Sequence, residues 1–143
     1  MKKPTGRLAE YQSWDGTDPF EDHVGPYYFK RVESGDILCA FEAKPHHCNG
    51  GGFLHGGSLM TFADYSLFAI ARDVLHGPGV TVSFNSEFIA AGQAGDLIQS
   101  RGKVVKSTGS MVFMRGEVFV ETDGKEHVLL NFSGIIKRLK PRT

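Results

Sequence analysis

The segment HCNGGGFLHGGSLMTFAD, residues 47–64, places glycines and polar side chains directly before an apolar run. Gly56 and Gly57 stand at the start of that run, where a helix would begin. The first amides of a helix carry unpaired N–H groups and a partial positive charge, and glycine lets the carbonyl oxygen of a ligand approach them. This arrangement could stabilise an oxyanion. Alternatively, the two glycines only permit a tight turn.

Asp64 is the one carboxylate of the apolar run that spans residues 56–71. Removing a carboxylate from water costs several kcal/mol unless it is hydrogen-bonded or meets solvent in a cleft. One interpretation is that Asp64 lines a pocket and serves as a general base or a nucleophile. The other is that it faces water or bonds to a backbone group. The residue type and its surroundings leave both open.

Three other polar side chains could take part in the same chemistry. Asn49 could hold a water or a substrate carbonyl, His55 could donate a hydrogen bond or act as a base, and Thr81 could orient a carboxylate or a water. Each also has a purely structural interpretation. Asn49 is a common loop residue, His55 could support a glycine-rich turn, and Thr81 is an ordinary residue for a strand.

Four potential metal ligands lie close together in the sequence: His46, His47, Cys48 and His55. Their spacing matches no regular zinc pattern, because three adjacent residues do not easily converge on one tetrahedral ion and no second pair follows downstream. We therefore expect no metal. The glycine-rich segments also lack the strand and helix context of a phosphate-binding loop, a dinucleotide fingerprint or a nucleophile elbow.

The chain has 143 residues, enough for one domain with a hydrophobic core. Its 16 basic and 16 acidic side chains give no net charge, which argues against a nucleic-acid partner because phosphate binding needs a basic surplus. No run approaches the roughly 18 apolar residues of a membrane span. The two cysteines make no disulfide framework, and the basic N-terminus has no apolar core behind it. We expect a cytoplasmic protein with no membrane partner.

The elements that must position these residues follow from periodicity and breakers. Residues 1–26 are polar and irregular, and predict a lead-in with at most a short helical turn. Residues 27–44 predict two extended pieces around the turn ESGD. A helix is predicted over residues 56–76, where Gly77–Pro78 would stop it. Four long strands are predicted downstream, at residues 79–90, 96–107, 109–124 and 125–139.

The predicted helix is apolar on nearly every side, which is typical of a buried helix. A flat sheet covers one face only, so the sheet must curl round the helix. The predicted fold class is therefore α+β, the hotdog fold: one long central helix wrapped by a curled antiparallel sheet of about five or six strands, as a single domain over residues 27–143. Because such a sheet leaves open edges, we expect pairing with a second copy.

The stretch NGGGFLHGGSLMTFAD resembles the motif of the hotdog-fold acyl-CoA thioesterases of the phenylacetate-degradation (PaaI-like) type. The motif is an asparagine, a glycine three residues on, His-Gly-Gly three residues further, and an acid seven residues beyond the last glycine. The matching positions are Asn49, Gly52, His55, Gly56, Gly57 and Asp64. The resemblance continues through the strands and turns that follow and covers roughly residues 35–138.

This resemblance implies an enzyme that hydrolyses an acyl or aryl thioester to the free acid and coenzyme A, with no cofactor beyond the coenzyme A of the substrate. It implies that Asp64 is the catalytic carboxylate, that Gly56 supplies an oxyanion-hole N–H and that Asn49 positions the water or the carbonyl. His55 would support the loop, and Thr81 would assist. The site would lie at a dimer interface, in a homodimer or a dimer of dimers.

The resemblance also implies a set of substrate-binding residues, which comprises Gly57, the candidates Phe53 and Leu54 for the acyl group, and the turn of Ser107, Thr108 and Gly109 for coenzyme A. Two other functions remain open. One is a non-catalytic acyl-CoA binding protein, although binding alone gains nothing from a desolvated Asp64. The other is a hydratase or dehydratase of acyl thioesters, which the spacing from Asn49 to Asp64 disfavours.

Overall fold

The computed structural model describes residues 3–14 and 18–140, so parts of the predicted lead-in, residues 1–2 and 15–17, lie outside the described residues. The helical elements are the 3₁₀ turns η1 (Gly6–Leu8) and η2 (Pro45–His47) and the helices α1 (Pro19–Val24), α2 (Gly56–Ile70) and α3 (Arg72–Leu75). The strands are β1 (Tyr28–Arg31), β2 (Ile37–Glu42), β3 (Gly79–Phe88), β4 (Leu97–Ser107), β5 (Met111–Thr122) and β6 (Lys125–Arg138).

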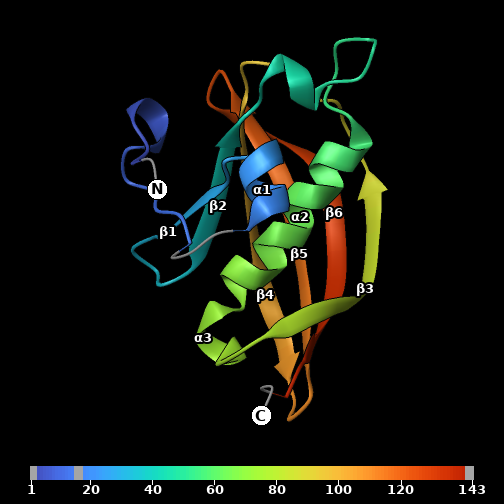
Figure 1. Cartoon of the computed structure of the whole chain (residues 1–143). Helices are drawn as coiled ribbons and strands as arrows, with labels where there is room; N and C mark the ends of the chain where they lie inside the picture. The colour runs from blue at the N-terminus through green and yellow to red at the C-terminus, as the bar shows by residue number, and fades with distance from the viewer. Residues whose placement is uncertain (1–2, 15–17, 141–143) are drawn as a thin grey trace.

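One six-stranded antiparallel sheet, in the order β1-β2-β4-β5-β6-β3, curls round α2 (Figure 1). This is the hotdog fold, so the predicted fold class is confirmed. The strand that follows the helices, β3, crosses to the far end of the sheet and pairs with β6. As a result β1 and β3 are the two edge strands, and β3 runs beside α2.

The core lies between α2 and the concave face of the sheet. Alternation in β2 directs Ile37, Cys39 and Phe41 to this face, where they join the same buried cluster as Phe62 and Leu67 of α2. Gly134 of β6 lets the helix approach, because a Cβ at that position would lie 2.5 Å from Cδ1 of Leu67. The close contact between helix and sheet fixes the rotation of α2, and therefore the direction in which Asp64 points.

The predicted strands are confirmed, with ends that shift by a few residues. An Asp-Gly turn joins β5 to β6. Asp123 and Gly124 have φ values of 53° and 77°, and Thr122 pairs with Lys125 on either side of them. Positive φ at both central residues is what a tight two-residue hairpin requires, and the Asp-Gly sequence satisfies it at little steric cost.

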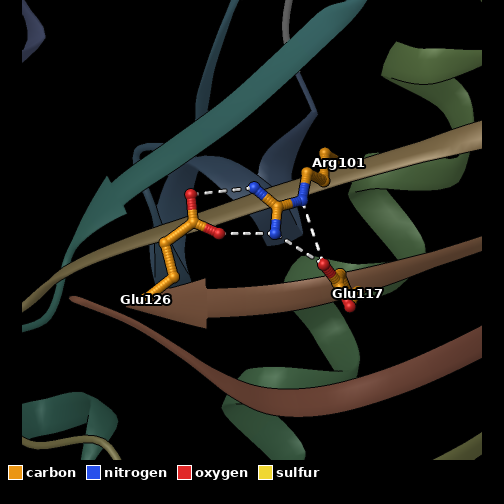
Figure 2. Close-up of polar contacts among 3 residues, drawn as sticks. All are labelled: Arg101, Glu117 and Glu126. Atoms are coloured by element: carbon orange, nitrogen blue, oxygen red, sulfur yellow. Dashed lines mark hydrogen bonds and ion pairs between the residues drawn. The ribbon is translucent and has the colours of Figure 1, made fainter. Parts of the chain in front are cut away.

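The convex face of the sheet carries a network of charges centred on Arg101 (Figure 2). Its guanidinium donates to Glu117 at 2.7 Å and to Glu126 at 2.6 Å, and it lies 4.0 Å from the ring centroid of Phe119. These hydrogen bonds lower the pKa of Glu126. The network connects β4, β5 and β6 on the side away from α2, so it supports the sheet and lies outside the site described below.

Two details of the predicted helix were wrong. First, the helix breaks at Ala71, whose ψ of 1° leaves the α-helical range; α3 then turns off and ends at His76, which has a φ of 47°. Second, α2 is not buried on every side. Met60 is 40% exposed, and Asp64 is half-buried beside it. The curled sheet ends at β3, so it leaves one stripe of α2 uncovered, which includes Met60 and Asp64.

The described part of the lead-in packs on this domain. Asp18 caps α1 by accepting a hydrogen bond from the backbone N–H of Glu21 at 3.0 Å. Trp14 packs against Phe29 and against Tyr65 of α2, with ring centroids 5.1 and 5.3 Å apart. The predicted boundary at residue 26 stays a prediction, but α1 is positioned by contacts with the helix that carries Asp64.

Candidate active site

The start of α2 has one free amide. His55 is the N-cap, and its Nδ1 accepts a hydrogen bond from the N–H of Gly57 at 2.8 Å. The N–H groups of Ser58 and Leu59 both donate to the carbonyl of His55. Within the described part of the chain the N–H of Gly56 has no partner. This amide is therefore available to an oxygen of a ligand, as an oxyanion hole requires.

The glycine at position 56 is required by its neighbour from β3. A Cβ there would lie 3.0 Å from Cε1 of the Phe88 ring, so only a glycine lets this ring pack directly over the start of the helix. The side chain of Phe88 is 56% exposed on its other side. The free amide thus lies next to the end of an edge strand, under a ring that presents apolar surface outward.

Asp64 is held by a residue of the neighbouring strand. Its Oδ1 accepts a hydrogen bond from the hydroxyl of Thr81 at 2.6 Å, and its Oδ2 has no partner among the described residues. The register of β3 against β6 shifts between Thr81 and Ser83, and a bulge of this kind re-aims the side chains beside it. One carboxylate oxygen is therefore fixed while the other faces the uncovered stripe of α2.

Asn49 organises the loop that leads into α2. Its Oδ1 accepts hydrogen bonds from the N–H of Gly51 at 2.9 Å and of Phe53 at 3.2 Å, and its backbone N–H donates to the carbonyl of Phe53. Gly52 has a φ of 86°, which favours glycine in this turn. The carbonyl oxygen of the Asn49 side chain is thus engaged, and only its NH₂ group is left to contact a water or a substrate.

His47 supports this loop, a role that the sequence did not indicate. It is 3% exposed; its Nδ1 accepts from the N–H of Lys44 at 2.9 Å, and its Nε2 donates to the carbonyl of Val24 at 2.5 Å. Its own carbonyl accepts from the N–H of His55 and from the hydroxyl of Ser58. Burial lowers the pKa of His47, so it stays neutral. It joins α1, the loop and α2.

The predicted substrate-binding residues do not converge within one chain. Leu54 is buried against Gly92, whereas Phe53 is 51% exposed beside it. The turn 107–109 lies at the opposite end of α2, where Arg138 donates to the carbonyls of Thr108 and Val74 and to the hydroxyl of Ser107. Their roles, and those of the catalytic residues, stay predictions.

The histidines and the cysteine before α2 are engaged in the loop itself. His46 packs on His47 with ring centroids 4.1 Å apart, and His55 caps the helix. Among residues 3–14 and 18–140, no three His, Cys, Asp or Glu side chains converge as metal ligands would. None of the helices in these ranges has both the length and the apolar character to cross a membrane.

A profile of the thioesterase superfamily matches residues 51–127, which include the start of α2, Asp64 and Thr81. The chain belongs to the thioesterase superfamily. The match confirms the predicted family and, with it, the predicted class of enzyme, a thioester hydrolase. The matched residues include Gly56 with its free amide, whereas Asn49 and His47, which support the loop before it, lie just outside them.

The chain is similar to two curated proteins and to one solved structure. The chain is 31% identical over 116 residues to a Pseudomonas aeruginosa protein named "Putative esterase PA0474", which covers 79% of this chain and 83% of the relative. It is 29% identical over 99 residues to a Haemophilus influenzae protein named "Uncharacterized acyl-CoA thioester hydrolase", covering 68% of this chain and 64% of the relative. A mutant of the phenylacetic acid degradation protein PaaI from Thermus thermophilus superposes with a TM-score of 0.69 at 30% identity, covering 85% and 100% of the two chains.

Proposed function

We propose that this protein hydrolyses acyl-CoA thioesters to the free acid and coenzyme A, at a site that two copies of the chain build together. The observation that carries the proposal is the Asp64 carboxylate, fixed at one oxygen by Thr81 and open at the other, on the uncovered stripe of α2 beside an edge strand. Membership of the thioesterase superfamily and the name of the Haemophilus influenzae relative support the substrate class.

The spacing along α2 argues for two copies. Gly56 and Asp64 are eight residues apart, which is about 12 Å along an α-helix at about 1.5 Å per residue. An oxyanion donor and a base must each lie about 3 Å from the reacting groups of a single thioester. The Gly56 amide and the Asp64 carboxylate of one chain are therefore too far apart to act on the same carbonyl.

The exposed edge of β3 offers a way to bring these groups together. This strand pairs only with β6, and it exposes apolar side chains at and just beyond its ends, namely Val80, Val82, Phe88 and Ile89. When β3 pairs antiparallel with β3 of a second copy, the start of each strand lies beside the end of the other. The Phe88 end of one chain, with Gly56 beneath it, then lies beside Thr81 and Asp64 of the other.

One cavity of the single chain lies away from Asp64. It has a volume of about 1200 Å³ and lies between the β1–β2 turn, α3 and the middle of β4 and β5. Its lining includes Ile37, Ile70 and Val74 but neither Asp64 nor Gly56. This cavity therefore does not serve Asp64, and the proposal places the acyl group between the two copies.

The proposed reaction uses the N–H of Gly56 from one chain and the carboxylate of Asp64 from the other. The carbonyl oxygen of the thioester accepts a hydrogen bond from the Gly56 N–H, which stabilises the negative charge that develops there. Asp64 either takes a proton from the attacking water or attacks the carbonyl carbon itself. The C–S bond then breaks and coenzyme A leaves as a thiolate. When Asp64 acts as the base, the proton that it took passes to the thiolate or to solvent. When Asp64 acts as the nucleophile, the acyl group stays on it as a mixed anhydride, which a water molecule hydrolyses to the free acid. A thiolate is a good leaving group, so the reaction as proposed needs no metal and no resident cofactor.

Hydrolysis of short, long and aryl acyl-CoAs, followed by release of free thiol, tests this proposal. Gly56→Pro is expected to lower kcat by about 10²-fold to 10³-fold, the effect of removing one oxyanion donor. Proline suits the first position of a helix, and His55 already has the extended conformation (ψ 137°) that a residue before proline adopts. The proline Cβ also displaces the Phe88 ring, so the matched control is Gly56→Ala, which adds the same Cβ and keeps the N–H. Both variants should keep their helical circular dichroism, and only the proline variant should lose the oxyanion donor. A parent protein that binds acyl-CoA without hydrolysing it would favour the non-catalytic alternative.

The pairing of β3 makes a second prediction. Val82→Lys puts a charge on the exposed edge, where Val82 is 48% exposed, so it should convert the dimer to a monomer and abolish hydrolysis. The matched control is Val105→Lys, at a position on β4 that is 51% exposed and away from β3. Sedimentation velocity reports the size of each variant. A fully active monomer of Val82→Lys would contradict the shared site.

A further inference from the structure

We infer that Glu21 of α1 is a positioning residue of the same site, whose carboxyl controls the charge beside Asp64. This inference rests on the proposed function. Glu21 lies outside the residues that match the superfamily profile, and in the sequence it falls in the polar lead-in. Its connection to Asp64 depends on how the lead-in packs against α2.

Contacts at both ends of α1 hold Glu21 against α2. The indole N–H of Trp14 donates to Oε1 of Glu21 at 3.1 Å, and the Trp14 ring packs on Tyr65, the residue after Asp64. At the other end of α1, the carbonyl of Val24 accepts the hydrogen bond from His47. Figure 1 shows α1 next to α2 on the side away from β3. The carboxyl is therefore held close to Tyr65 of α2, where its charge and that of Asp64 act on each other.

Glu21 is partly buried, and within residues 3–14 and 18–140 no cation forms an ion pair with its carboxylate. The hydroxyls of Tyr27 and Tyr65 are buried and have no hydrogen-bond partner in the described part of the chain, and the charge of Glu21 acts on both. The nearby cation Arg72 lies over Phe29 at 4.3 Å. The charged or titratable groups that face Glu21 are Asp18 and Asp22 of its own helix, Tyr27, and Asp64 and Tyr65 of α2.

Burial, followed by the charge of Asp18, raises the pKa of Glu21 to about 7; the hydrogen bond from Trp14 opposes this rise, and the charge of Asp64 adds to it. Folding therefore favours the protonated form, and the stability that this form contributes is lost as the pH rises through about 7. Below that pH, Asp64 has a neutral neighbour. Above it, a second negative charge lies near the carbonyl that must itself become negative.

Trp14 provides a direct readout because it is the only tryptophan of the chain. Its fluorescence should change between pH 5 and pH 9 with a midpoint near 7 in the parent protein. The change should disappear in Glu21→Gln, which keeps every histidine. The matched control is Asp22→Asn, which removes an exposed charge from the same helix. It should preserve the change, with a slightly lower midpoint because the charge of Asp22 is the smallest contribution to the rise in the pKa of Glu21. Persistence of the midpoint near 7 in Glu21→Gln would overturn the assignment to Glu21.

The pH dependence of kcat/KM tests the link to the site. If only the protein with neutral Glu21 is active, kcat/KM of the parent should be about tenfold lower at pH 8 than at pH 6, while Glu21→Gln should show no such decrease. Asp22→Asn should follow the parent. Equal alkaline decreases in the parent and in Glu21→Gln, with the fluorescence change lost, would overturn the link to Asp64. A parent protein that hydrolyses no acyl-CoA at any pH would instead refute the proposed function, and the fluorescence titration would still decide the ionisation of Glu21.

Discussion

Asp64→Asn is expected to lower kcat for acyl-CoA hydrolysis by about 10³-fold, within the range of about 10² to 10⁴ for loss of a general base. The asparagine keeps an oxygen that can accept the hydrogen bond from Thr81, now 2.6 Å from the carboxylate. It cannot take a proton from water, and it is a poor nucleophile. Thiol release at saturating acyl-CoA measures the effect, which should fall on kcat with little change in KM.

The matched control for this variant is Asp73→Asn on α3. Asp73 makes an exposed ion pair with Arg31, at 2.9 Å, so the same chemical change there should leave kcat unchanged. Both variants should unfold at temperatures close to that of the parent, because each replaces a carboxylate by a group of the same shape. An Asp64→Asn protein that retains more than about a tenth of the parent kcat would exclude Asp64 as the base or the nucleophile.

The secondary structure could be predicted because its signals are local. The alternation through Ile37, Cys39 and Phe41 indicates a strand with one buried face, and the Asp-Gly pair at 123–124 indicates a tight hairpin. The uncovered stripe of α2 could not be predicted. Met60 and Leu59 are both apolar, yet one is 40% exposed and the other 3%, because coverage depends on where the curled sheet ends.

The candidate site could also be predicted only in part, because some of its contacts join segments that are distant in the sequence. The spacing from Asn49 to Asp64 indicates a helix that begins with free amides and carries one acid. The use of the Asn49 side-chain oxygen within its own loop could not be read from that spacing. The roles of His47 and Glu21 depend on segments distant in sequence: His47 bonds to Val24, 23 residues earlier, and Glu21 is affected by Asp64 across the packing of α1 on α2.

Two inactive variants are expected to restore activity when they share a dimer. If Gly56 of one chain serves Asp64 of the other, a mixed dimer of Gly56→Pro and Asp64→Asn has one site with both changes and one site with neither. Random exchange at equal concentrations makes about half of the dimers mixed, so about a quarter of the parent activity should return. Differently tagged chains, unfolded and refolded together, allow the mixed dimers to be isolated and assayed.

The control mixture pairs Asp64→Asn with Thr81→Ala. Because Thr81 bonds to Asp64 of its own chain, each site of that mixed dimer carries one change, and mixing should give only the mean activity of the two single variants. Return of activity in the first mixture alone requires that Gly56 and Asp64 act across the dimer, as their separation of about 12 Å along one helix implies. If the first mixture also gives only the mean activity of its two variants, both groups of each site lie on a single chain, and α2 would then have to bend or unwind between them.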